Sequence, residues 1–330
     1  MIFVGKAPYR ISLLGGGSDL DWFVKDNNYG TCFGYSLEKF SYSVINVLPS
    51  EASKGILEYS TREDYCSINE IVHPIVREVL ADLKIPKFIE LKTFGFASGG
   101  SGLGGSASFM ISLIASLSKA FDNNISNDEI VKKACYLEIN KLNKPIGKQD
   151  QYLCGNHGLN SFNFYSDNSV KKNKISLNKK LLIERLINDF YLIPTNKKRN
   201  SDSVLTHLKN DNRSTDKIME IRNIANNFLK LKEDREYLLE EKFHQSVKES
   251  WQLKKSISHV MTDHLNEQYE FINNLIPNNW IRLLGAGSGG YFLISSKINK
   301  NELFKLSAES GLKGLFQAKI SNEGISSFEL

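Results

Sequence analysis

Apolar side chains recur along the chain with two different periods. Residues 88–94 alternate apolar and polar positions as a strand does, and residues 40–48 also favour a strand, whereas residues 71–83 and 106–117 place apolar side chains at helical spacing. In the second half, residues 190–193 and 280–284 favour strands around two long helices. The apolar faces of those helices are formed by Phe243, Val247 and Trp251 and by Met261, Leu265 and Ile272. Since strands and helices do not alternate strictly, the pattern predicts an α+β fold rather than a purely parallel sheet.

A polar stretch at residues 165–180 interrupts this apolar pattern. The chain has 330 residues, of which 41% are hydrophobic, and is therefore long enough for two domains that each bury a core. We predict a linker in the polar stretch, with an N-terminal domain over residues 1–180 and a C-terminal domain over residues 181–330.

A glycine-rich turn separates the strand at residues 88–94 from the helix at residues 106–117. Glycines let the backbone approach an oxyanion closely, and the free N–H groups and the dipole of a helix N-terminus favour negative charge. Close packing of a strand and a helix would also explain glycines, but so many glycines followed by hydroxyl side chains favour phosphate binding. The residues expected to bind a nucleotide are Gly99, Gly100, Ser101, Gly102, Leu103, Gly104, Gly105, Ser106, Ala107 and Ser108.

Three kinds of nucleotide-binding loop could account for this turn. A Walker loop needs a Lys before its Ser or Thr, and the turn has none. Residues 100–105 satisfy the dinucleotide pattern, with Asp122 near the distance of a ribose-binding acid, but Asp122 lies in a predicted turn rather than at the end of a second strand. Residues 102–107 closely resemble the third kind, the loop of the GHMP small-molecule kinases.

Two further segments resemble the same family and occur in the expected order. Residues 7–20 resemble its first motif in the sugar-kinase form, and residues 284–292 resemble its third motif, a glycine turn followed by a strand. Residues 71–78, 147–152 and 249–255 are similar to segments of the heptose 7-phosphate kinases within the family. The resemblance implies an N-terminal domain like the second domain of ribosomal protein S5, a ferredoxin-like C-terminal domain, and an active site between them.

Glu138 is the first candidate for a metal ligand. A capping box at residues 126–129 opens a helix that Pro145 ends, and Glu138 lies on the apolar stripe of that helix. A carboxylate in such a place is costly unless it is paired with a cation, so the pattern by itself leaves a buried ion pair and a metal site open. The resemblance implies that Glu138 and Ser106 bind Mg²⁺, a cation that takes oxygen ligands and shares nucleotide phosphates.

The resemblance also implies roles for other residues. Asp150 follows the helix in a predicted loop and corresponds to the base that accepts the proton of the attacking sugar hydroxyl. Arg10 corresponds to a cation beside the transferred phosphoryl group. The residues expected to bind the sugar and its phosphate are Gly16, Gly17, Ser18, Asp19, Arg199 and Gly287.

Composition limits which partners and which cellular compartment are expected. The formal net charge of +5 is modest and Lys is dispersed, so the charge does not require a nucleic-acid partner and indicates at most an attraction for anionic substrates. No apolar run reaches the length of a membrane span, and residues 1–6 lack the pattern of a signal peptide. We expect a cytoplasmic protein with scattered free thiols and no membrane partner, and leave a homodimer open.

Together these features predict an ATP- and Mg²⁺-dependent kinase that phosphorylates the anomeric hydroxyl of a mannoheptose 7-phosphate and feeds a surface-polysaccharide pathway. One alternative is a kinase of the same family for an unphosphorylated sugar such as fucose or galactose. A second alternative is a sugar sensor on the same scaffold that has no catalytic activity. A third is a nicotinamide-dependent oxidoreductase that uses residues 100–105.

Overall fold

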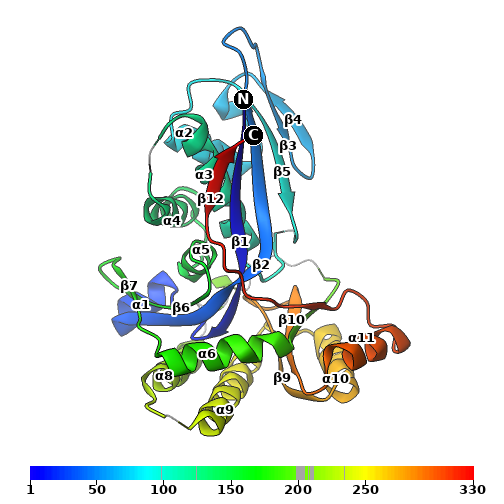
Figure 1. Cartoon of the computed structure of the whole chain (residues 1–330). Coiled ribbons are helices and arrows are strands. Elements are labelled where there is room, and N and C mark those ends of the chain that lie inside the picture. Colours follow the sequence, from blue (N-terminus) through cyan, green and yellow to red (C-terminus); the bar gives the residue numbers. More distant parts are fainter. Residues whose placement is uncertain (98, 124, 198–204, 207, 209–211, 234) are drawn as a thin grey trace.

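Two sheets meet near the centre of the molecule (Figure 1). The computed structural model describes residues 1–97, 99–123, 125–197, 205–206, 208, 212–233 and 235–330. Within these residues, no helix is both long and apolar enough to cross a bilayer.

The first sheet is built around β1 (Ile2–Leu14) and the long β2 (Tyr29–Val47), which pair antiparallel. Its order is β12-β1-β2-β5-β3-β4, and β6 and β7 extend it from the first half of β2. The other strands are β3 (Gly55–Glu58), β4 (Arg62–Tyr65), β5 (Ile89–Gly95), β6 (Leu159–Tyr165), β7 (Val170–Lys172) and β12 (Ser326–Glu329). The last of these brings the C-terminal end of the chain back beside the first strand (Figure 1).

Helix α3 (Gly105–Ala120) is the central helix on this sheet, and most of its side chains are buried. It lies so close to β1 that a Cβ at Gly5 would stand 2.0 Å from the carbonyl oxygen of Ser112. This close approach fixes where the N-terminus of α3 emerges. The neighbouring elements are α1 (Asp21–Asn27), η1 (Ile68–Glu70), α2 (Pro74–Asp82), α4 (Asn127–Tyr136), the π-helical turn η2 (Leu137–Lys141) and α5 (Gln149–Cys154).

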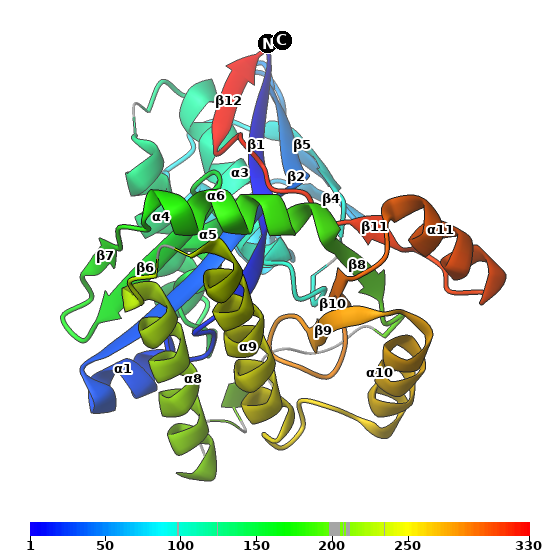
Figure 2. The ribbon, with the colours of Figure 1, turned by 60° about the horizontal axis from the view of Figure 1, so that its bottom comes forward.

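The second sheet has the order β11-β8-β10-β9, with all neighbouring strands antiparallel. Along the chain, its four strands are connected as in a ferredoxin-like unit, except that three helices, α8, α9 and α10, lie between β8 and β9 where the simple β-α-β-β-α-β unit has one. Figure 2 shows α8 and α9 side by side beneath α6. The elements are α6 (Leu177–Leu186), η3 (Ile187–Asp189), β8 (Phe190–Pro194), α8 (Asn212–Lys230), α9 (Glu236–Lys255), α10 (Asp263–Leu275), β9 (Asn278–Leu283), β10 (Tyr291–Ser296), α11 (Lys300–Glu309) and β11 (Phe316–Gln317).

One hydrophobic cluster joins the two sheets. It contains Tyr9 and Ile11 of β1, Leu192 of β8, Phe243 of α9 and Leu293 of β10. Because β1 contributes to this cluster, the ends of β1 and β2 lie against the second sheet, and a site between the two halves is held by packing on both sides.

The predicted α+β fold is confirmed, and each predicted strand and long helix has a counterpart. The polar stretch at residues 165–180 is not wholly a linker, because it contains β7 and the first residues of α6. The domain boundary at residue 180 stays a prediction.

Candidate active site

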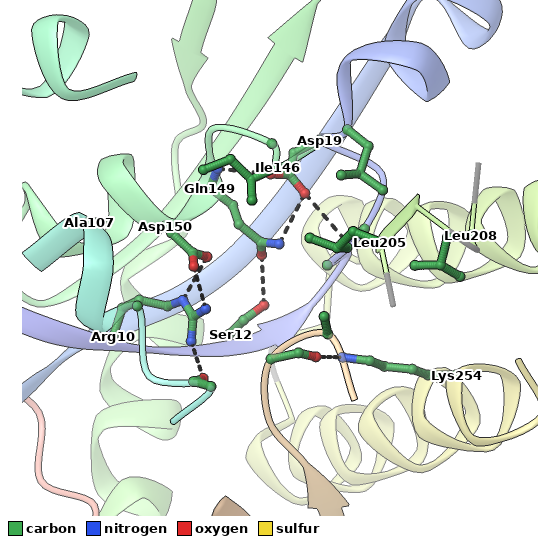
Figure 3. A pocket seen from close by; sticks show the side chains of 18 of the residues that line it. Arg10, Ser12, Asp19, Ala107, Ile146, Gln149, Asp150, Leu205, Leu208 and Lys254 are labelled. Carbon is green, nitrogen blue, oxygen red and sulfur yellow. Dashed lines mark hydrogen bonds and ion pairs between the residues drawn. The ribbon is translucent and has the colours of Figure 1, made fainter. Parts of the chain in front are cut away.

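A pocket lies where the glycine-rich turn, β1, the start of α5 and the second half of the chain converge (Figure 3). Its polar side chains come mainly from the first half, and its aliphatic wall comes mostly from the second. The polar lining residues are Arg10, Ser12, Asp19, Ser106, Glu138, Lys144, Gln149, Asp150, Lys254 and Arg282.

The glycine-rich turn packs closely against β1 and α5 on one side and against the third glycine motif on the other. Gly104 precedes α3 with φ +74°, and a Cβ there would stand 2.9 Å from side-chain atoms of both Arg10 and Cys154. Gly102 has φ +79°, and its Cβ would stand 2.6 Å from the carbonyl oxygen of Leu284 in the third glycine motif. Only glycine fits both positions. The turn therefore presents the N-terminus of α3 to the pocket without a side-chain cap, as an anion site requires.

Only part of the predicted nucleotide segment faces the pocket: Gly100, Gly102, Gly104, Gly105, Ser106 and Ala107. Gly99, Ser101, Leu103 and Ser108 do not line it. Leu103 is fully buried in the cluster between the sheets, and Ser101 is buried with its hydroxyl accepting from the Leu103 amide. The Ser108 hydroxyl donates to the Ala7 carbonyl, so it ties α3 to β1 instead of reaching a phosphate.

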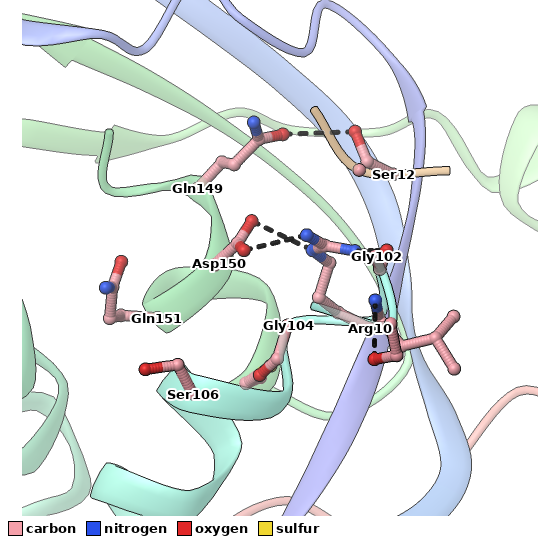
Figure 4. A network of polar contacts seen from close by, with 12 residues as sticks. Arg10, Ser12, Gly102, Gly104, Ser106, Gln149, Asp150 and Gln151 are labelled. Atoms are coloured by element: carbon pink, nitrogen blue, oxygen red, sulfur yellow. Dashed lines mark hydrogen bonds and ion pairs between the residues drawn. The ribbon is translucent and has the colours of Figure 1, made fainter. Parts of the chain in front are cut away.

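Arg10 and Asp150, which both line the pocket, form a bidentate ion pair (Figure 4). Arg10 Nε donates to Asp150 Oδ1 at 2.9 Å and Nη2 donates to Oδ2 at 2.7 Å, while Nη1 donates to the Gly102 carbonyl. The Arg10 side chain is 4% exposed and that of Asp150 is 32% exposed, so the carboxylate is the partner that a ligand can reach. Asp150 was expected in a loop, and this is wrong, because it lies in the first turn of the short helix α5.

Ser106 and Glu138 are brought together as the resemblance implied. Glu138 is 1% exposed, and its Oε1 accepts a hydrogen bond from the Ser106 hydroxyl. Lys144 Nζ donates to both groups, at 3.0 Å to Ser106 Oγ and 3.1 Å to Glu138 Oε1. Gln151 Nε2 donates to Glu138 Oε2 at 2.6 Å. The Ser106 and Glu138 oxygens thus already accept hydrogen bonds from one cation, the Lys144 ammonium, which neutralises the buried carboxylate.

These residues fit a magnesium ion that keeps waters and shares phosphate oxygens, because Ser106 and Glu138 offer oxygen ligands at the edge of the anion site. They do not form a cage made of protein groups alone. Over the part of the chain that the structure describes, no group of three or more His, Cys, Asp and Glu side chains could hold a metal.

Asp19 is buried behind the glycine turn that ends β1. Its Oδ2 accepts from the Gln149 amide at 2.9 Å, and its Oδ1 accepts from Gln149 Nε2 at 3.0 Å and from the Gly17 amide at 3.3 Å. A Cβ at Gly147 would stand 2.0 Å from Asp19 Oδ2, which explains the glycine three residues before Asp150. Burial, supported by the charge of Asp150, raises the pKa of Asp19 to about 6.

The remaining predicted sugar-site residues divide into three groups. Gly16 and Gly17 line the pocket beside Asp19. Ser18 is buried, and its hydroxyl donates to the carbonyls of Gly15 and Thr31, while Gly287 packs against Val260 and does not line the pocket. Arg199 lies outside the described residues.

Sequence reasoning missed the aliphatic wall and five polar lining residues, of which Ser12 and Gln149 are hydrogen-bonded to each other. Lys144, Lys254 and Arg282 line the pocket, and Lys254 Nζ donates to the Gly285 carbonyl. The local signals were a Lys directly before the helix-ending Pro145, a Lys within the segment at residues 249–255, and an Arg two residues before the third motif. The aliphatic side chains of the wall are Leu20, Ile146, Leu205, Leu208, Ile218, Ile221, Ile257 and Val260.

The raised pKa of Asp19 predicts a pH-dependent stability. The folded protein holds this proton up to about pH 6, whereas the unfolded chain releases it near pH 3.8. The stabilisation is therefore complete below about pH 4 and is lost as the pH rises through 6. Relative to Asp19→Asn, the free energy of unfolding of the wild type should fall by about 2–3 kcal/mol between pH 4 and 7. Urea denaturation of both proteins between pH 4 and 7 measures this difference in the free energy of unfolding. If the unfolding free energies of the two proteins changed in parallel with pH, the prediction would be wrong.

The dinucleotide alternative for the glycine-rich turn disagrees with the topology. A ribose-binding acid should end a second parallel strand after α3. Asp122 instead lies in the turn that directly follows α3, and the next element is α4.

Comparisons with known proteins agree with the kinase resemblance. Residues 70–158, which include the glycine-rich turn and Asp150, match the family model of the GHMP kinases N terminal domain. The chain is 26% identical over 345 aligned positions to the D-glycero-alpha-D-manno-heptose 7-phosphate kinase of Campylobacter jejuni, covering 98% of both chains.

Two solved structures share the whole fold. A D-glycero-D-manno-heptose 1-phosphate kinase from Bacteriodes thetaiotaomicron superposes with a TM-score of 0.74 at 18% identity, covering 99% of each chain. The galactokinase of Lactococcus lactis complexed with galactose gives 0.74 at 16% identity, covering 98% of this chain and 95% of that one. The resemblance is therefore confirmed: residues 70–158 match the N-terminal domain of the GHMP kinases, and the whole chain has the GHMP kinase fold.

Proposed function

We propose that this protein is a sugar kinase that transfers the γ-phosphoryl group of ATP to a sugar hydroxyl. The observation that carries the proposal is the placement of the Arg10–Asp150 pair in the same pocket as the N-terminus of α3 and the Ser106–Glu138 pair. An anion site, a cation and a reachable carboxylate are the groups that phosphoryl transfer to an alcohol requires.

Each polar group has a role in this reaction. The glycine-rich turn binds the nucleotide phosphates through backbone N–H groups. Arg10 neutralises charge on the transferred phosphoryl group and orients Asp150, which accepts the proton of the attacking hydroxyl. Asp19 accepts hydrogen bonds from other sugar hydroxyls. The Gln149 amide, which donates to Asp19, directly precedes Asp150 in sequence, so this bond fixes the position of Asp19 relative to Asp150.

Ser106 and Glu138 would hold Mg²⁺ with the nucleotide. Bound there, the ion would neutralise phosphate charge. Lys144 is positioned to balance Glu138 in the nucleotide-free protein, since it already donates to both oxygen ligands.

Ser106→Ala and Glu138→Gln are each expected to weaken Mg²⁺-dependent nucleotide binding, because each removes one oxygen ligand. Calorimetric titration of ATP at several Mg²⁺ concentrations measures this, and higher Mg²⁺ should partly restore binding. Glu129→Gln is a matched control, since its carboxylate caps the exposed start of α4. Titrations that match the wild type in both variants would remove Ser106 and Glu138 from the metal site.

For the acceptor we propose a mannoheptose 7-phosphate, phosphorylated at its anomeric hydroxyl in a cytoplasmic route to surface polysaccharide. The similarity to a heptose 7-phosphate kinase over 98% of both chains supports this acceptor. A second candidate is an unphosphorylated sugar such as fucose, which the aliphatic wall around Leu205, Leu208 and Ile218 favours because it suits a deoxy or methyl group.

ADP release over a panel of sugars tests the function and separates the candidates. The panel holds D-glycero-D-manno-heptose 7-phosphate, the free heptose, fucose and galactose, each at several concentrations with saturating ATP. Turnover confined to the heptose phosphate supports the first proposal, and turnover of a free sugar supports the second. No ADP release with any sugar would refute the kinase assignment for these acceptors.

A further inference from the structure

Lys144 donates hydrogen bonds to the same two oxygens that would bind Mg²⁺. Its ammonium lies 3.0 Å from Ser106 Oγ and 3.1 Å from Glu138 Oε1. The Ser106 hydroxyl also donates to Glu138 Oε1, so the three groups form one closed cluster. A metal ion bound to both oxygens would therefore have to take the place of the ammonium.

The turn after η2 fixes the backbone of Lys144 but not the end of its side chain. The Lys144 amide donates to the Glu138 carbonyl at 3.1 Å, Asn143 has a left-handed φ of +51°, and Pro145 restricts the residue before it. The Lys144 side chain is 24% exposed and lines the pocket, whereas that of Glu138 is 1% exposed. Its flexible stem can therefore turn the ammonium towards the pocket while the carboxylate stays in place.

Gln151 keeps the carboxylate of Glu138 oriented. Its Nε2 donates to Glu138 Oε2 at 2.6 Å, and both side chains are buried. This bond uses the oxygen that Lys144 does not contact, so it does not depend on the position of the ammonium. Glu138 thus presents the same oxygen, Oε1, to either cation.

Asp150 and Glu138 are each neutralised by a cation of the protein. Arg10 pairs with Asp150, and Lys144 pairs with Glu138. Free Mg²⁺ would meet no uncompensated negative charge at Glu138 and would be repelled by the ammonium at the same oxygen. Nucleotide phosphates change this balance, because they bring enough negative charge for Mg²⁺ and for Lys144 together.

We propose that Lys144 is an exchangeable cation that occupies the metal ligands until a nucleotide binds. It keeps free divalent cations out of the site, so that Mg²⁺ enters only with the nucleotide, whose phosphates then accept the ammonium. Metal binding and nucleotide binding are coupled by this exchange. The proposal rests on the proposed function for the identity of the metal and the nucleotide, but its test requires no turnover.

The first test measures binding of Mn²⁺ to the nucleotide-free protein by electron paramagnetic resonance, since Mn²⁺ takes the same oxygen ligands as Mg²⁺. Lys144→Met should raise the affinity for Mn²⁺ by about 10- to 100-fold, because the competing ammonium is gone. Lys144→Arg keeps the charge and should bind Mn²⁺ as weakly as the wild type. Combining Lys144→Met with Glu138→Gln should abolish the gain, which assigns it to Glu138.

The second test adds ADP, with a correction for the Mn²⁺ that ADP binds in solution. ADP should strengthen Mn²⁺ binding to the wild type more than to Lys144→Met, and the two ratios should differ by about tenfold or more. A lysine that only balanced the charge of Glu138 would not couple the two ligands.

Thermal unfolding keeps the test valid if Lys144→Met is unstable. This variant leaves Glu138 buried without a counter-ion, so its melting temperature should fall and should then rise more with added Mg²⁺ than that of the wild type. The variant that combines Lys144→Met with Glu138→Gln removes both charges and should show no such rise.

Lys133→Met is the matched structural control. Lys133 also forms a partly buried ion pair, with Asp82, but does not line the pocket. Its loss should lower stability without changing the affinity for Mn²⁺.

Equal Mn²⁺ affinities of Lys144→Met and the wild type would overturn the proposal, as would a gain that persists with Glu138→Gln. If Lys144→Met shows the gain but the wild type phosphorylates no sugar, the exchange stands and the proposed function fails. If the wild type phosphorylates a sugar but Lys144→Met shows no gain, the function stands and the exchange fails.

Discussion

Asp150→Asn is expected to lower kcat by about 10²- to 10⁴-fold, because the amide cannot accept the proton of the attacking hydroxyl. The change should leave the pocket nearly intact, since the remaining side-chain oxygen can still accept one of the two hydrogen bonds from Arg10. ATP affinity should therefore stay near that of the wild type, and the loss should appear in kcat and kcat/KM alike.

Steady-state rates with the best acceptor, together with calorimetric titration of ATP, measure this effect. Asp21→Asn is a matched control, because Asp21 lies in the neighbouring helix α1, is about half exposed and pairs with Lys25 across one helical turn. A kcat for Asp150→Asn within about threefold of the wild type would remove Asp150 from the chemistry.

The parts of the site that sequence predicted are those carried by local pattern. The glycine-rich turn and α3 are adjacent in sequence, so periodicity and composition placed a helix N-terminus there. The apolar stripe of its helix predicted only that Glu138 is buried beside a cation, and the family resemblance implied that Glu138 lies with Ser106. The stripe continues to Glu138 even though that residue lies in a π-helical turn, where the Leu142 amide bonds to the Leu137 carbonyl.

The helix α5 illustrates a limit of periodicity. It has six residues, and Gln151, Tyr152, Leu153 and Cys154 are all buried, so it has no polar face to set against an apolar one. A pattern of one and a half turns carries too little signal to distinguish a helix from a loop. The role of Asp150 could be inferred from the resemblance, but the helix that aims it at Arg10 could not.

Contacts between distant segments account for what the sequence could not predict. Arg282 follows Trp280 and Ile281 in an apolar strand, and nothing near it in sequence indicates that its partner is the carbonyl of Leu13, 269 residues away. The return of β12 to the edge of the first sheet beside β1 is of the same kind. Lys144 reaches Ser106 only because packing of α3 against α4 and α5 sets their separation.

Loss of Arg10 should be as damaging as loss of Asp150. Arg10→Met keeps the length of the apolar stem but removes the charge, and we expect kcat to fall by about 10³-fold or more, as for arginines that stabilise transferred phosphoryl groups. Arg10→Lys should recover part of this loss, since an ammonium restores the charge but cannot make both bonds to Asp150 and a third to the Gly102 carbonyl.

The double variant Arg10→Met with Asp150→Asn distinguishes a shared role from two separate ones. If the pair acts as a unit, kcat of the double variant should lie within about tenfold of the more impaired single variant, because the first change already disables the second residue. Nucleotide titration reports separately on the glycine-rich turn, whose Gly102 carbonyl loses a donor in Arg10→Met. Multiplicative losses in kcat would mean that Arg10 and Asp150 act independently, and Arg10 would then be assigned to phosphate binding alone.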